Sequence, residues 1–148
     1  MRALKTAAIV AAILALSAGS AAAQRSHVGF HGGYNFDLEE GLIGAQMHIP
    51  VGRLIEFYPS FDYYLISGSS LVGIGIDLKL RFPARPMELY VGGGLNILRS
   101  SGNTETAPDF FGGLETRLGS SHPYFEVRAL LHDPSMVQLV AGINFTLF

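Results

Sequence analysis

The stretch VGIGIDLKLRF, residues 72–82, alternates without exception between apolar side chains and small or charged ones. Successive side chains of an extended strand point to opposite faces of a sheet. The apolar face holds Val72, Ile74, Ile76, Leu78, Leu80 and Phe82. The opposite face holds Gly73, Gly75, Asp77, Lys79 and Arg81. This period of two predicts a long β-strand with one fully apolar face.

Seven further segments show the same alternation and are separated by turn residues. The predicted strands are 28–36, 41–50, 53–65, 71–82, 88–98, 108–118, 123–132 and 136–147. The short connections imply that neighbouring strands are antiparallel. The stretch RSSGNTETA, residues 99–107, is long and polar, so we expect a mobile loop there that offers a contact surface for a partner. His122 and His132 fall at turns, where we expect solvated side chains.

The first residues have the pattern of a cleavable secretory signal. Arg2 and Lys5 precede an apolar run at 7–16, and small residues end in Ala-Ala-Ala at 21–23. We therefore expect residues 1–23 to be a signal peptide and residues 24–148 to form a single exported domain. This predicts passage through the inner membrane of a bacterial cell.

Composition excludes several classes of protein. The chain has no cysteine, so its fold is not a disulfide scaffold. Its formal net charge is −2, and no basic cluster provides a footprint for nucleic acid. We expect no nucleic-acid partner.

Eight strands with one apolar face close in one of two ways: with that face inward as a soluble barrel, or outward as a membrane barrel. The soluble alternative predicts a periplasmic or secreted protein that binds an apolar ligand between Phe57, Phe61, Ile74 and Val91. Its polar face would meet water, yet glycine recurs on that face, where it weakens an exposed strand. These glycines are Gly29, Gly33, Gly44, Gly73, Gly75, Gly92, Gly94, Gly113 and Gly142. Inside a narrow barrel, glycines leave room for large neighbouring side chains.

The charges on the polar face are of both signs, as a packed polar interior requires. The acidic residues are Glu56, Asp62, Asp77, Glu88, Glu115 and Glu126, and the basic ones are Lys79, Arg81, Arg117 and Arg128. The apolar face of 72–82 projects to roughly 25 Å at a tilt near 40°, about the height of a lipid-facing band. Both observations favour the membrane barrel, with these charges in its lumen and the apolar face of 72–82 in lipid.

The chain ends in AGINFTLF, residues 141–148, an aromatic-terminated strand. Together with the leader, the alternation and the glycine-rich face, this ending resembles the small eight-stranded outer-membrane barrels of the OmpA and OmpX type. The resemblance implies an all-β, eight-stranded, antiparallel up-and-down transmembrane β-barrel. It also implies outer-membrane lipid as the surroundings and the barrel-assembly machinery as a partner during biogenesis. An architecture carries no specific activity with it.

The histidines raise two chemical alternatives, a catalytic site and a metal site. Lipid A-modifying barrels use a histidine with serine or acidic partners, and His31, His48, Ser60 and Asp62 are the nearest candidates here. No local motif of such enzymes is present, and two histidines without a companion carboxylate are weak evidence for a metal site. We therefore expect a non-enzymatic monomer without cofactor or metal, with a structural or surface-interaction role in the cell envelope.

Overall fold

The computed structural model describes residues 25–147, which form eight β-strands. The strands are β1 (His27–Asn35), β2 (Glu40–Pro50), β3 (Ile55–Tyr64), β4 (Leu71–Pro83), β5 (Met87–Ser100), β6 (Asn103–Thr116), β7 (Ser121–Leu130) and β8 (Met136–Thr146). No helix among these residues is long and apolar enough to cross a membrane. The signal peptide predicted for residues 1–23 lies outside the described residues.

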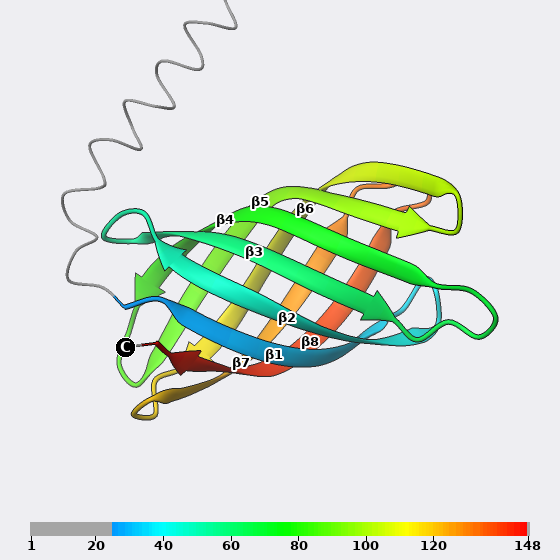
Figure 1. The fold of residues 1–148 in the computed structure, drawn as a ribbon. Coiled ribbons are helices and arrows are strands. Elements are labelled where there is room, and N and C mark those ends of the chain that lie inside the picture. Colours follow the sequence, from blue (N-terminus) through cyan, green and yellow to red (C-terminus); the bar gives the residue numbers. More distant parts are fainter. Residues whose placement is uncertain (1–24, 148) are drawn as a thin grey trace, which may run out of the picture.

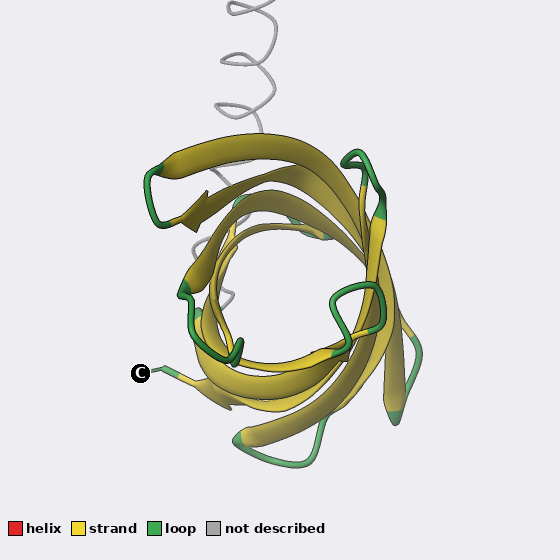
Figure 2. Cartoon of the chain, turned by 90° about the vertical axis from the view of Figure 1, so that its right-hand side faces the viewer, coloured by secondary structure: helices red, strands yellow, loops and turns green. Residues whose placement is uncertain are grey.

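The strands close into one barrel. Each strand pairs antiparallel with the next along the chain, and β1 pairs with β8 (Figures 1 and 2). This confirms the predicted eight-stranded antiparallel barrel. The start of β1 and the end of β8 lie together at one end, with the turns at 51–54, 84–86 and 117–120; we call it the terminal end. The turns at 36–39, 65–70, 101–102 and 131–135 lie at the other, which we call the hairpin end.

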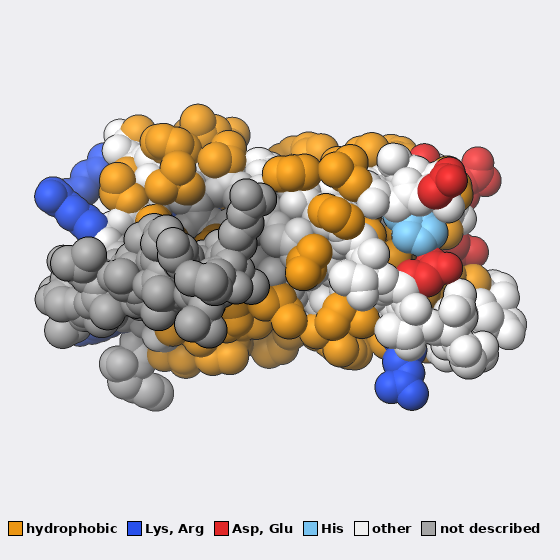
Figure 3. All heavy atoms as spheres, turned by 90° about the horizontal axis from the view of Figure 1, so that it is seen from above, with side chains coloured by type: hydrophobic (Ala, Val, Ile, Leu, Met, Phe, Trp, Pro, Cys, Tyr) orange, Lys and Arg blue, Asp and Glu red, His pale blue; other side chains and the backbone are white. Residues whose placement is uncertain are grey.

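Burial alternates along the strands with the period that the sequence predicts. On β4, Ile74, Ile76, Leu78, Leu80 and Phe82 are exposed and Val72 is half-buried, while Asp77, Lys79 and Arg81 are buried. Every other strand also exposes large apolar side chains, including Phe30 at 63% and Phe110 at 59%. Figure 3 shows apolar side chains around the waist of the barrel and charged side chains at its two ends. The packing is the reverse of that in a water-soluble domain, where charged side chains are rarely buried.

The prediction of a mobile loop at 99–107 is wrong. Strands β5 and β6 continue through this segment, Ser100 pairs with Asn103, and Gly102 turns the chain with a φ of 84°. Glycine adopts this left-handed conformation at little cost. Both faces of the outer part of β6 are exposed, from Asn103 to Thr106, so polarity here marks a strand that extends beyond the barrel wall. Figure 1 shows this hairpin projecting at the hairpin end.

Two predictions near the terminal end are also corrected. Strand β6 ends at Thr116, so Arg117 lies in the following turn instead of within the predicted strand 108–118. Strand β7 begins at Ser121, which places His122 on its inner face at 4% exposure, so the predicted solvated turn position of His122 is wrong. His132 does lie between strands, partly exposed, with its Nε2 2.5 Å from Glu105 Oε2. Because β7 begins with two polar residues, Ser121 and His122, the alternation does not reveal that the strand starts there.

Candidate functional site: the polar lumen

The inner wall of the barrel is lined by buried polar side chains, which together we call the polar lumen. Eight of the nine residues predicted to form it are buried. Arg117 is the ninth and lies at the terminal end with 41% of its side chain exposed. The eight are Glu56, Asp62, Asp77, Lys79, Arg81, Glu115, Glu126 and Arg128. Their strands place them inside because each alternates with an outward apolar residue.

Arg128 on β7 is the centre of the first ion-pair cluster. Its Nη1 donates to Asp77 Oδ2 at 2.7 Å and to Asp109 Oδ2 at 2.5 Å, and its Nε donates to Glu126 Oε1 at 3.2 Å. The guanidinium also lies 4.3 Å from the centre of the Phe111 ring. One arginine thus joins carboxylates from β4, β6 and its own strand, a use that suits its planar fork of donors.

Lys79 and Arg81 on β4 form a second cluster nearer the terminal end. Lys79 Nζ donates to Glu115 Oε2 at 2.9 Å and lies 3.8 Å from the centre of the Tyr90 ring. Arg81 donates twice to Glu88, at 2.5 and 2.7 Å, and its Nη1 donates to Glu56 Oε1 at 2.8 Å. Buried charges persist when they are paired in this way, because unpaired they lose their hydration without compensation.

Amide side chains connect this second cluster to the middle of the barrel. Asn144 Nδ2 donates to Glu115 Oε1 at 3.3 Å, and Gln46 Nε2 donates to Asn144 Oδ1 at 2.6 Å. His31 follows, with Nδ1 2.5 Å from Gln46 Oε1 and Nε2 2.6 Å from Asp62 Oδ1. These contacts join five strands and hold the walls of the barrel together from within.

Little empty space remains in the middle of the polar lumen. The cavity there measures about 10 Å³ and is lined by His31, Tyr58, Ser60, Asp62, Glu126, Arg128, Gln138 and Val140. A cavity needs roughly 10–15 Å³ to hold one water molecule. The barrel is therefore filled by its own side chains at this height.

Asp109 is a lumen residue that was not predicted; it is fully buried and bound to Arg128. The signal was present, since Asp109 directly precedes the outward-facing Phe110, but it lay next to the supposed loop. His27 and His122 were not predicted to lie in the lumen either. Both are buried near the terminal end, with ring centres 4.9 Å apart. With Asp109 included, the buried carboxylates of the described chain clearly outnumber its buried lysine and arginine side chains.

The histidines considered for catalysis or metal binding are not brought together. Strand pairing places His31 opposite Gly44 and His48 opposite His27. His31 and His48 therefore lie at different heights in the barrel. Both ring nitrogens of His31 are engaged by Gln46 and Asp62, and neither by Ser60. Among residues 25–147, no group of three or more His, Asp and Glu side chains is arranged to hold a metal ion.

The apolar ligand site of the soluble alternative is contradicted. Phe61, Ile74 and Val91 are exposed on the outer wall, and Phe57 alternates with the buried Glu56 and Tyr58 on the same outward phase. No interior cavity lies between these residues, because the barrel wall separates them from the lumen.

Comparison with solved structures places this fold among small outer-membrane barrels. The N-terminal β-barrel domain of Pseudomonas aeruginosa OprF superposes with a TM-score of 0.70 at 15% identity, over 84% of this chain and 98% of that one. Neisserial surface protein A (NspA) gives 0.60 at 14% identity, over 82% and 97%. The Yersinia pestis outer membrane protein Ail gives 0.56 at 12% identity, over 82% and 99%. No protein-family model and no curated protein matches the sequence.

The chain thus has the fold of the small eight-stranded outer-membrane β-barrels. At these identities the likeness is one of architecture, and an architecture hosts many functions.

Proposed function

We propose that this chain is an integral protein of the bacterial outer membrane, exported through the inner membrane and inserted as a monomeric barrel in contact with outer-membrane lipid. The observation that carries the proposal is the reversed packing: apolar side chains cover the outside and paired charges fill the inside. In water this outer surface would be a large exposed apolar patch, which soluble monomers avoid. In lipid it is the expected surface, and a closed barrel leaves no strand edge unpaired.

The role that we propose is structural or surface-interacting, without enzymatic activity. The filled middle of the polar lumen supports a barrel that conducts little or nothing. The engagement of both nitrogens of His31 supports hydrogen bonding within the lumen instead of acid-base catalysis. The β5–β6 hairpin, which extends beyond the wall, is the part best placed to meet a partner outside the cell if the terminal end faces the periplasm.

Envelope fractionation tests this proposal. Expressed with its own leader in a bacterium with two membranes, the chain should pellet after carbonate extraction and sediment with the outer membrane on a density gradient. Samples kept unheated before electrophoresis should migrate differently from boiled ones, because the closed barrel resists unfolding by detergent. Full release by carbonate, with purification as a soluble protein without detergent, would overturn the proposal.

A further inference from the structure

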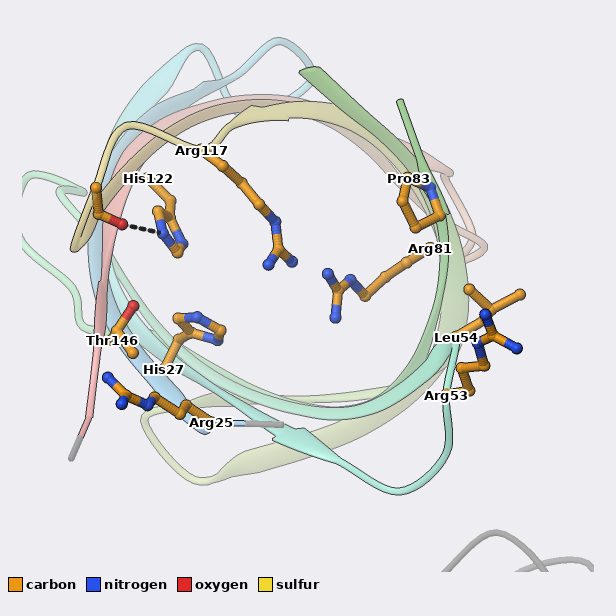
Figure 4. A pocket seen from close by; sticks show the side chains of 10 residues that line it. Arg25, His27, Arg53, Leu54, Arg81, Pro83, Arg117, His122 and Thr146 are labelled. Atoms are coloured by element: carbon orange, nitrogen blue, oxygen red, sulfur yellow. Dashed lines mark hydrogen bonds between the residues drawn. The ribbon is translucent and has the colours of Figure 1, made fainter. Parts of the chain in front are cut away.

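A basin opens at the terminal end of the lumen, and we call it the mouth. Its volume is about 760 Å³. It is lined by Arg25, His27, Arg53, Leu54, Arg81, Pro83, Arg117, Gly119, His122 and Thr146. Figure 4 shows Arg117 reaching into the basin beside His122 and Arg81 reaching in from the opposite wall. His27 lies on the same side as His122, and Arg53 lies on the rim.

The mouth is strongly basic. Four of its lining residues are arginine, two are histidine and none is acidic. Glu88, which lies deeper in the lumen, contacts two arginines. Arg81 donates two hydrogen bonds to it, and Arg117 Nη2 lies 3.1 Å from its Oε2. Arg117 is still 41% exposed, and its contact with Glu88 is made through one terminal nitrogen, Nη2. Glu56 and Glu88 together hold Arg81 and Arg117, so the net positive charge of the mouth comes from the further lining arginines, Arg25 and Arg53.

The charges of the two ends are segregated. The described turns at the terminal end contain no acidic residue, and Arg85 adds a further exposed arginine there. The exposed or half-buried acidic residues gather at the hairpin end: Asp37, Glu39, Glu40, Glu105 and Asp133. Figure 3 shows basic side chains at one end and mainly acidic ones at the other. A basic concavity with low-dielectric walls concentrates anions at its opening.

The floor of the mouth is closed. Arg81 is fixed there by Glu56 and Glu88, and beyond it the lumen narrows to the cavity of about 10 Å³. An anion that enters from the terminal end therefore meets a blind basin and cannot pass through the barrel. The basin's volume lies within the range of small-molecule sites, roughly 300–1,000 Å³.

We propose that the mouth is a binding site for a small polyvalent oxyanion, a molecule that carries phosphate or carboxylate groups. Arg117 and Arg25 supply guanidinium donors, whose forked geometry matches both kinds of group. His27, His122 and Thr146 line the side of the basin next to Arg25. The site goes beyond the envelope role proposed above, because a barrel with no such ligand would still have that role.

Calorimetric titration with inorganic pyrophosphate tests the site. The full chain, folded in zwitterionic detergent at fixed ionic strength, should bind pyrophosphate saturably with one site per barrel. Arg117→Gln should weaken binding about tenfold, since it removes charged hydrogen bonds to the anion. Arg25→Gln, which lies outside the strands, should also weaken it. Arg99→Gln makes the same change of charge at the hairpin end and should leave the affinity within about twofold.

The outcomes separate the alternatives. Heat-modifiable migration of each variant shows that its barrel is folded. Competition by citrate supports a free anion as ligand, whereas competition by a short-chain phosphatidylglycerol, and not by citrate, assigns the oxyanion site to a lipid headgroup. Absence of saturable binding by the unaltered chain would overturn the proposal. Equal weakening by Arg99→Gln would also overturn it, because it would show attraction to net charge alone.

Discussion

Arg128→Met is expected to lower the free energy of unfolding by about 3–5 kcal/mol, the cost of removing one partner from a buried ion-pair network. Arg128 is the described basic residue that contacts Asp77, Asp109 and Glu126, and methionine fills similar space without a charge. Three carboxylates would then face one another inside the barrel. Urea titration of the chain in lipid vesicles, followed by circular dichroism and by the gel shift, measures the change.

Two further variants distinguish the loss of the Arg128 ion-pair network from general destabilisation of the barrel. Arg99→Met removes an exposed arginine at the hairpin end and should change stability by no more than about 0.5 kcal/mol. Adding Asp77→Asn and Asp109→Asn to Arg128→Met should restore much of the loss, because the repelling charges are gone. A small effect of Arg128→Met alone would contradict the proposed role of this cluster in holding the barrel.

Gly113→Ala is expected to destabilise the barrel by about 1–3 kcal/mol, the usual range for overpacking a tight interior. Gly113 lies on the inner face of β6, where an added Cβ would overlap the Phe125 carbonyl oxygen and lie 2.5 Å from the Tyr90 hydroxyl oxygen. Backbone on one side and a buried ring on the other leave little room for adjustment. The same urea titration measures the effect.

Gly112→Ala is the matched control, since Gly112 is the neighbouring residue on the outer face. Its added Cβ would lie 3.6 Å from the Tyr90 carbonyl oxygen and 3.8 Å from Val91 Cγ1, which are ordinary contact distances. We expect this variant to be nearly neutral. Equal destabilisation by the two changes would show that strand propensity, and not the filled lumen, determines the cost.

The inner and outer faces were predictable from the sequence because a strand has a strict period of two. The alternation of 72–82 placed Asp77, Lys79 and Arg81 together on one face, and the structure has them buried. The prediction of a loop at 99–107 failed because polar residues are typical both of a loop and of a strand that extends beyond the apolar outer face of the barrel. Pattern alone does not distinguish these two cases.

Which charges pair was not predictable, because pairing depends on the register and curvature of the closed barrel. Arg128 meets Asp77, 51 residues earlier in the chain, only because β7 and β4 lie across the lumen from each other. The basic mouth has the same origin. Arg25, Arg81 and Arg117 are far apart in the sequence, and closure of the sheet brings them to one opening.

Labelling of single-cysteine variants in lipid vesicles tests the central claim, that the outer apolar face lies in lipid. The chain has no cysteine of its own, so each variant reports one position. Ile76→Cys, at an outward position that is 49% exposed in the protein alone, should resist a charged, water-soluble maleimide until the barrel is unfolded. Ser101→Cys and Ser120→Cys, in exposed turns at the two ends, should react readily in the folded barrel. Labelling of Ile76→Cys in vesicles as fast as that of the two turn variants would contradict the membrane-spanning barrel.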